Sequence, residues 1–368
     1  MPGLFQSTVT YHLRPVLHLL EDPTVTEVLI NGPGEVFVEI RGRLQRVEGV
    51  TFSGEEELRA ACINIAQYSN KVFDREHPRF DGRLPDGSRV HVIGPPPAPF
   101  LAIAIRKFAR EALGPKEIVE LGTLSKEAMA LLRAAILMKR NLIVSGGTGS
   151  GKTTLLTILA CFIPADERIV IMEDTAELHI DKPHVVQLEA HLGDEQGRGE
   201  ITIRDLLHST LRLRPDRIIV GEVRGGEALD LLNTLNSGHG GTMTTLHANS
   251  AVSALGKLET LVLFAGEDLP IRAIRGQVAD AVDLVLQVAR FPDGSRRVEQ
   301  IAEVLSGLDE HGNYRMNTLF RFQGQGMVDG VIQGGLVPTG RLPSFYDSAI
   351  GKGVPLDKRW FIPRKAAE

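Results

Sequence analysis

The glycine-rich stretch Ser145 to Thr154 (SGGTGSGKTT) constrains this chain more than any other part of its sequence. It follows the apolar run 141–144, which predicts a short buried strand, and it precedes the apolar run 155–160, which predicts a helix. Between a strand and a helix, the pattern Gly-x4-Gly-Lys-Thr turns consecutive backbone N–H groups toward phosphate oxygens, and the helix N-terminus adds partial positive charge. The sequence therefore predicts a nucleoside triphosphate site.

The roles of single residues in this loop follow from the same chemistry. Lys152 is expected to reach the β- and γ-phosphates of ATP, and the Thr153 hydroxyl is expected to bind Mg²⁺. The alternative is a flexible Gly/Ser turn without a ligand, which the flanking strand and helix disfavour. The residues expected to contact the nucleotide are Gly147, Thr148, Gly149, Ser150, Gly151, Lys152, Thr153 and Thr154.

Length and composition limit the remaining classes of protein. A chain of 368 residues exceeds the usual size of a single core, so two domains are expected. The net charge of -5 gives no overall positive field, so we expect no stable nucleic-acid partner. Cys62 and Cys161 are too few for a disulfide framework or a four-cysteine zinc site, which fits a reducing cytoplasm. No apolar run approaches membrane-spanning length, so contact with a membrane would require docking on an embedded partner.

Residues 1–105 read as one mixed α+β domain. Strands are expected at 25–30 and 35–40, a helix at 55–68, a strand pair within 81–93 and a further strand at 101–106. The segment 106–121 would be a linker.

Residues 122–319 show a different sequence pattern, in which predicted helices alternate with short apolar strands. This alternation, with a glycine loop after the first strand, predicts a largely parallel sheet that is covered on both faces and binds ligands at the carboxyl ends of its strands. Residues 320–368 are rich in Gly and Pro, with scattered aromatic residues, and are expected to form a small appendage. Strands are expected at 141–145, 168–173, 185–188, 217–223 and 242–246, and helices at 126–138, from 152, at 203–213, 227–235 and 250–263.

Two buried strands are expected to end in acids. The run 169–172 leads into Glu173, which is placed to polarise an attacking water, with Glu177 as a second candidate; either acid could instead only cap the next element. The run 218–221 leads into Glu222, at the position where a carboxylate holds the Mg²⁺ shell in glycine-loop NTPases. Arg224 follows closely and is an equally good structural partner for these acids.

Histidines and arginines complete the candidate site. His239 and His247 flank a short strand, and His247, at its carboxyl end, is better placed to touch the γ-phosphate; a satisfied loop histidine is the alternative reading. A departing phosphate also needs cations, which arginines of another domain or subunit can supply. The candidates in the first domain are Arg83, Arg89 and Arg106.

In order along the chain, these segments resemble the secretion ATPase superfamily of type II secretion, type IV pilus and type IV secretion motors. The resemblance rests on GGTGSGKTT, IVIMEDTAEL, LRLRPDRIIVGEVRGGEALDLLNTLNSGH and GHGGTMTTLHANS, which match the family's Walker A loop, Asp box, Walker B segment and His box. RLPDGSRV, IRKF, RFPDGSRRV and the tail TGRLPSF…GKGVPLDKRWF are most similar to the CpaF-like ATPases of Tad pili. LRPVLHLLEDPTVTEVLINGPG and LLHSTLRLRPDRI also look like the TrbB-like ATPases of conjugative transfer.

The resemblance implies a RecA-like P-loop motor domain with a PAS-like N-terminal domain, in a ring that is most simply a hexamer. It implies family roles for Glu173, Glu222 and His247, and it matches Arg83, Arg89 and Arg106 to stretches that reach the γ-phosphate. It also implies a cytoplasmic protein at the inner face of the cell membrane, docked on a platform protein of a pilus or secretion system. The chain starts close to its first domain, so partner docking through the longer helical leader of many CpaF-like proteins is not expected.

Three functions follow as hypotheses. The first is an ATP-hydrolysing motor for pilus assembly or protein secretion, and the second is the same motor in conjugative transfer. The third is a nucleotide-gated scaffold with little turnover. A RecA-type DNA translocase is a weaker option, because the mildly acidic composition disfavours it.

Overall fold

The computed structural model describes residues 8–40, 42–107, 113–191, 193 and 198–363. The chain divides into two compact units, residues 1–112 and 113–368. Each unit has its own sheet, and each is described by itself here.

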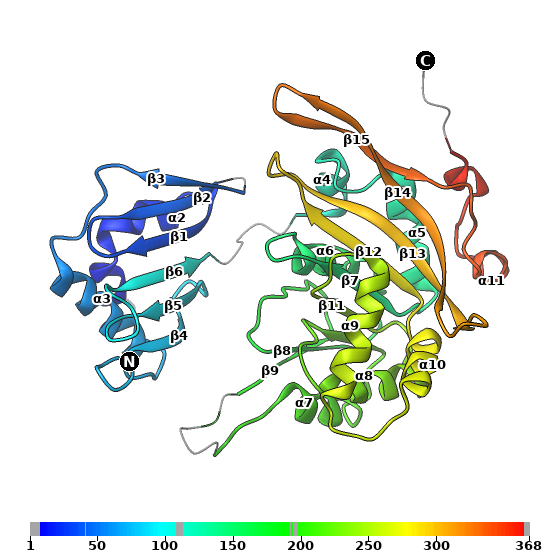
Figure 1. The fold of residues 1–368 in the computed structure, drawn as a ribbon, viewed down its shortest axis with the longest axis horizontal. Helices are drawn as coiled ribbons and strands as arrows, with labels where there is room; N and C mark the ends of the chain where they lie inside the picture. The colour runs from blue at the N-terminus through cyan, green and yellow to red at the C-terminus, as the bar shows by residue number, and fades with distance from the viewer. Residues whose placement is uncertain (1–7, 41, 108–112, 192, 194–197, 364–368) are drawn as a thin grey trace. The chain divides into compact units, whose positions relative to one another are not determined.

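The first unit is built on a six-stranded antiparallel sheet in the order β3-β2-β1-β6-β5-β4 (Figure 1). Helix α3 supplies Leu58, Ala61 and Ile65, which are fully buried in the core of this unit. The elements are α2 (Leu17–Glu21), β1 (Val25–Asn31), β2 (Val36–Ile40), β3 (Arg43–Val47), α3 (Glu55–Tyr68), β4 (Arg79–Arg83), β5 (Arg89–Ile93) and β6 (Ala102–Arg106).

The second unit is a nine-stranded sheet in the order β15-β14-β13-β12-β7-β11-β10-β8-β9. The strands from β12 to β9 are parallel, and β13, β14 and β15 continue the sheet as antiparallel neighbours. Its strands are β7 (Leu142–Gly146), β8 (Ile169–Glu173), β9 (Val185–Glu189), β10 (Arg217–Val220), β11 (Met243–Leu246), β12 (Leu284–Arg290), β13 (Arg296–Leu308), β14 (Tyr314–Val328) and β15 (Val331–Pro338).

Helices cover both faces of this sheet (Figure 1). Successive residues of a strand point to opposite faces, and in β7 Leu142 and Val144 join the core cluster of α5 and α6, whereas Ile143 joins that of α7 to α10. The helices are α4 (Pro115–Glu120), α5 (Lys126–Leu137), α6 (Lys152–Ala160), α7 (Ile203–Thr210), α8 (Glu227–Asn236), α9 (Ala251–Leu263), α10 (Ile271–Ala281), α11 (Tyr346–Gly351) and the 3-10 helix η2 (Lys358–Phe361).

The C-terminal residues differ from the small appendage that their composition predicts. The expected boundary after residue 319 lies inside β14, so residues 320–338 continue the central sheet. Phe320, Phe345 and Phe361 are at most 2% exposed and belong to the same core cluster as α5 and α6. The sequence does not reveal this continuity because strand pairing depends on partners far away in the chain.

The predicted linker 106–121 also contains structure. Helix α4 belongs to the second unit and packs Ile118 into the core cluster of α5 and α6. Residues 108–112 lie outside the described residues.

Candidate functional site

The glycine loop joins β7 to α6 at the carboxyl edge of the parallel sheet. Gly149 and Gly151 have φ values of +67° and +92°, a backbone region that side chains with a Cβ rarely adopt. Ser150 Oγ donates a 2.8 Å hydrogen bond to the Gly147 carbonyl. Lys152 is 8% exposed, and its Nζ donates to the carbonyls of Gly146 (3.2 Å) and Gly147 (3.1 Å). The predicted strand, loop and helix are therefore present, with the lysine folded over the loop.

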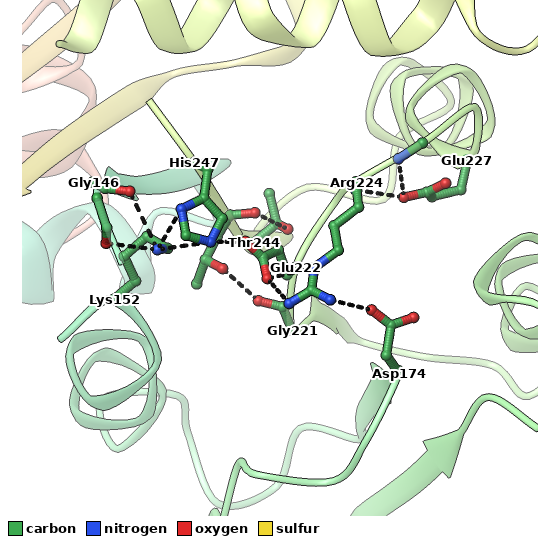
Figure 2. Close-up of polar contacts among 12 residues, drawn as sticks. Gly146, Lys152, Asp174, Gly221, Glu222, Arg224, Glu227, Thr244 and His247 are labelled. Atoms are coloured by element: carbon green, nitrogen blue, oxygen red, sulfur yellow. Dashed lines mark hydrogen bonds and ion pairs between the residues drawn. The ribbon is translucent and has the colours of Figure 1, made fainter. Parts of the chain in front are cut away.

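Three side chains from three different elements meet at this edge (Figure 2). Lys152 Nζ, at the start of α6, lies 3.3 Å from His247 Nδ1, one residue after β11. His247 Nε2 in turn lies 2.8 Å from Oε1 of Glu222, which follows β10 by two residues. The structure thus brings together the lysine, the histidine and the second acid that the sequence singled out.

Burial and neighbouring charges together set the protonation of His247. Burial lowers the pKa of His247; Glu222 opposes that shift, and the positive charge of Lys152 lowers the pKa further. His247 is therefore neutral at pH 7, so it can donate one hydrogen bond and accept another. A neutral imidazole between an ammonium group and a carboxylate is suited to sensing a phosphate oxygen.

Arg224 and Asp174 extend the network beyond the residues assigned to catalysis. Arg224 Nε donates a 2.7 Å hydrogen bond to Glu222 Oε2, and its Nη1 lies 3.6 Å from Asp174 Oδ2. Glu227, in the first turn of α8, accepts the Arg224 and Gly225 backbone N–H groups through one oxygen. Arg224 therefore bridges the loops that follow β8 and β10. It is a structural partner of these acids, as the sequence analysis allowed.

Glu173 ends β8 with a carboxylate that is engaged by its own chain. Its Oε1 accepts the backbone N–H groups of Glu177 and Leu178, both at 2.9 Å, and its Oε2 accepts Gln187 Nε2 at 2.9 Å. Burial raises the pKa of Glu173, and these three hydrogen bonds oppose that shift. In this conformation Glu173 orders the loop after β8. Gln187 has no sequence signal, because it reaches Glu173 only through the pairing of β8 with β9.

The site has oxygens suited to Mg²⁺. Glu222 Oε1 is buried and has no hydrogen-bond partner in the described structure, although His247 Nε2 lies 2.8 Å away. Thr153 follows Lys152 in the first turn of α6. Mg²⁺ is usually held by one or two protein oxygens together with water and substrate phosphates, so Thr153 and Glu222 fit the ion as a partial ligand set. Within the described ranges, no three His, Cys, Asp or Glu side chains come together as a complete metal site.

The three candidate arginines lie in the first unit and share one row of its sheet. Arg83 pairs with Arg89, Arg89 pairs with Arg106, and Arg106 pairs with Glu27 on β1. Directly paired residues of antiparallel strands point to the same face, so the three arginine side chains start from one face of the sheet. The spacing of the arginines in the sequence does not indicate this row, which depends on strand register.

His239 lies away from this network. It precedes β11, at the opposite end of the strand from His247, and its Nδ1 lies 3.2 Å from Ser237 Oγ. His239 therefore matches the alternative interpretation, a loop histidine whose ring has a polar partner within the loop itself.

Two further arginines, Arg290 and Arg296, lie against the glycine loop and were not predicted as site residues. Arg296 Nε donates a 2.9 Å hydrogen bond to the Gly149 carbonyl. Arg290 Nη1 lies 3.6 Å from the position that a Cβ on Gly149 would occupy. Both belong to the segment RFPDGSRRV, whose pattern was noted only as a resemblance to one branch of the family.

Among the residues that the structure describes, no helix has both the length and the apolar character that crossing a bilayer requires.

The chain is similar to known proteins of conjugal transfer and type IV secretion. The conjugal transfer protein TrbB of Rhizobium radiobacter is 37% identical over 299 residues, which cover 79% of this chain and 87% of TrbB. The type IV secretion system protein VirB11 of Brucella suis is 34% identical over 329 residues, covering 81% of this chain and 90% of VirB11.

Solved structures confirm the predicted fold class. The X-ray structure of the Legionella pneumophila ATPase DotB aligns with a TM-score of 0.56 and 19% identity, and the alignment covers 83% of this chain and 82% of DotB. The described architecture is therefore a RecA-like P-loop motor domain with an α+β N-terminal domain. The family model described as "Type II/IV secretion system protein" matches residues 10–325. The chain belongs to the family of type II/IV secretion system proteins.

Proposed function

We propose that this ATPase is a ring motor, most simply a hexamer, that couples ATP hydrolysis to movement of its N-terminal domain against its motor domain. The observation that carries the proposal is the meeting of Lys152, His247 and Glu222 beside the glycine loop, because these groups come from three separate elements. A side-chain set of this kind suits the terminal phosphate of ATP.

Each residue has a role in the proposed reaction. Lys152 holds the β- and γ-phosphates, and Thr153 and Glu222 hold Mg²⁺, which would neutralise charge on the phosphates. His247 contacts the γ-phosphate. Glu173 assists the attacking water; its raised pKa suits a base, but Gln187 Nε2 must first release Oε2. Arg83, Arg89 and Arg106 add positive charge from an N-terminal domain, and their common row is suited to a polyanion.

Two cargo systems are candidates, and each has its own support. The segments RLPDGSRV, IRKF and RFPDGSRRV are similar to CpaF-like ATPases, which favours pilus assembly or protein secretion through an inner-membrane platform protein. The 37% identity to a conjugal transfer protein favours conjugative transfer instead. In either system the protein would act in the cytoplasm at the inner face of the cell membrane. Deleting the gene and measuring surface pili and conjugation frequency side by side separates the two candidates.

The site assignment is tested with two variants. Lys152→Ala removes the ammonium group and is expected to abolish phosphate release and to weaken nucleotide binding strongly. Glu222→Gln keeps the side chain's size but removes its charge, so it is expected to retain ATP binding and to lower kcat by at least about tenfold. Phosphate release and binding of a fluorescent ATP analogue measure the two effects. Wild-type turnover by Lys152→Ala would overturn the assignment.

A further inference from the structure

The hairpin between β12 and β13 lies directly against the glycine loop. Strand β12 runs parallel to β7, with Val288 in register with Gly146. A Cβ on Gly146 would lie 2.3 Å from the Val288 carbonyl oxygen, so the two backbones are in close contact. The residues after Val288 therefore emerge at the carboxyl edge of the sheet, beside the phosphate-binding loop.

Two guanidinium groups stand on this hairpin and face the loop. Arg290 and Arg296 pair directly across it, so their side chains lie on the same face. Arg296 Nε donates to the Gly149 carbonyl at 2.9 Å, and its Cδ lies 3.2 Å from where a Cβ on Gly151 would be. Arg290 is exposed, and its Nη1 lies 3.6 Å from the equivalent point on Gly149. Gly149 and Gly151 therefore have two roles: they permit the positive φ values of the loop, and their lack of a side chain leaves room for the two arginines.

Several side-chain contacts hold the hairpin in place. Asp293 Oδ1 accepts the backbone N–H and the Oγ of Ser295, and its Oδ2 accepts the Ile332 N–H from β15. Arg297 is 8% exposed; its Nη2 donates to the Ile332 carbonyl at 2.7 Å, and its guanidinium lies over the rings of Phe291 and Phe322.

The backbone around Arg296 is also held by Thr123, which precedes α5. Thr123 Oγ1 donates to the Arg296 carbonyl at 2.7 Å, and the Thr123 carbonyl accepts the Val298 N–H at 3.0 Å. The backbone that carries Arg290 and Arg296 is therefore preorganised, so binding an anion orders only their side chains.

The position of the hairpin indicates which part of a nucleotide it would meet. Strand β7 lies between β12 on one side and β11 on the other. The groups assigned to the terminal phosphate, Glu222 and His247, follow β10 and β11, whereas the two arginines stand on the β12 side. The backbone N–H groups of such a loop hold the α- and β-phosphates. A nucleotide that extends across the loop from His247 therefore directs its α-phosphate toward the hairpin.

The geometry points to Arg290 as a ligand of the nucleotide's α-phosphate, with Arg296 as the residue that positions the glycine loop beside it. This inference rests on the proposed nucleotide site and deepens it. An α-phosphate contact is shared by ATP and ADP, so Arg290 binds both nucleotides equally well and holds the product as firmly as the substrate. The arginines of the N-terminal domain, by contrast, would distinguish ATP from ADP.

The experiment measures the affinity of the full chain for fluorescent analogues of ADP and ATP. Arg290→Ala is expected to weaken both by the same factor, about tenfold or more, because a charge-assisted hydrogen bond is lost. The loss should appear in KM rather than in kcat, since the contact is the same in the ground state and the transition state. Arg290→Lys is expected to recover part of the affinity. Arg315→Ala is the matched control, because Arg315 is an exposed arginine of β14 in the same sheet.

Each other outcome has a distinct meaning. If Arg290→Ala binds both analogues as the wild type does while Lys152→Ala binds neither, the α-phosphate contact is wrong and the nucleotide site stands. A loss confined to the ATP analogue would place Arg290 at the terminal phosphate and overturn the inference. If Arg315→Ala loses as much nucleotide affinity as Arg290→Ala, the loss comes from the change in net charge, and the inference is overturned. Wild-type binding by Lys152→Ala would remove the proposed function itself.

Discussion

At the scale of single residues, the glycine loop could be predicted from its local sequence pattern. Some of the residues that contact the loop could not be predicted in this way. The loop's strand, turn and helix are encoded by adjacent residues, so the sequence placed Lys152 correctly at the first turn of α6. Glu222 could be chosen because it follows an apolar strand, and His247 because it lies at the carboxyl end of a short predicted strand. Arg290 and Arg296 could not, because they reach the loop only through the parallel pairing of β12 with β7.

Glu173 gives a prediction about pH. Its folded pKa is raised above the value in the unfolded chain, chiefly by burial, so the contribution of its protonated form to stability is present below pH 4.5 and is lost as pH rises through the folded pKa. Glu173→Gln cannot titrate. The melting temperature of the wild type relative to this variant is therefore expected to fall as pH rises from 4.5 toward neutrality.

Thermal unfolding of both proteins at several pH values measures this difference. Glu177→Gln serves as the control, since Glu177 is linked to Glu173 through its backbone N–H. A constant difference between wild type and Glu173→Gln across the range would contradict the raised pKa.

At the scale of elements, apolar patterns identified α3, α5 and the parallel strands β7 to β11, whereas the parallel strand β12 was not predicted. Other elements lacked such a pattern. Strand β3 is almost wholly exposed, so its residues do not alternate between apolar and polar. Strands β14 and β15 carry several glycines and owe their place to long-range pairing. Composition alone therefore suggested an appendage where the chain completes the central sheet.

Phe320 tests whether this C-terminal segment is part of the motor core. It is fully buried, and its ring centroid lies 5.9 Å from that of Phe361. Phe320→Ala is expected to destabilise the second unit by about 3–5 kcal/mol, the usual cost of removing a buried aromatic side chain. Chemical denaturation measures the loss. Met327→Ala, in the same strand but 56% exposed, should have little effect. Similar stability of both variants would mean that the segment is not integral to the core.

At the scale of the whole molecule, the change in sequence pattern near residue 122 predicted a domain boundary. The structure has two compact units, which divide between residues 112 and 113. Each has a separate hydrophobic core of its own sheet and helices. The N-terminal arginine row and the glycine loop are thus carried by different units.

A ring motor predicts a dependence on concentration. The ATPase activity per subunit is expected to rise several-fold as the protein concentration increases through the range in which sedimentation shows assembly, because in the proposed ring each added subunit would complete a neighbour's site. A nucleotide-gated scaffold would show little phosphate release at any concentration. Activity per subunit that is substantial and independent of concentration would contradict the ring.

The turn from β12 into β13 has a mechanical consequence. Strands β8, β10 and β11 leave the catalytic edge through loops, which can bend. Strand β12 instead reverses within residues 291–295 and continues as a hydrogen-bonded ladder through β13, β14 and β15. We therefore expect a load on the outer strands to reach the glycine loop through continuously paired backbone.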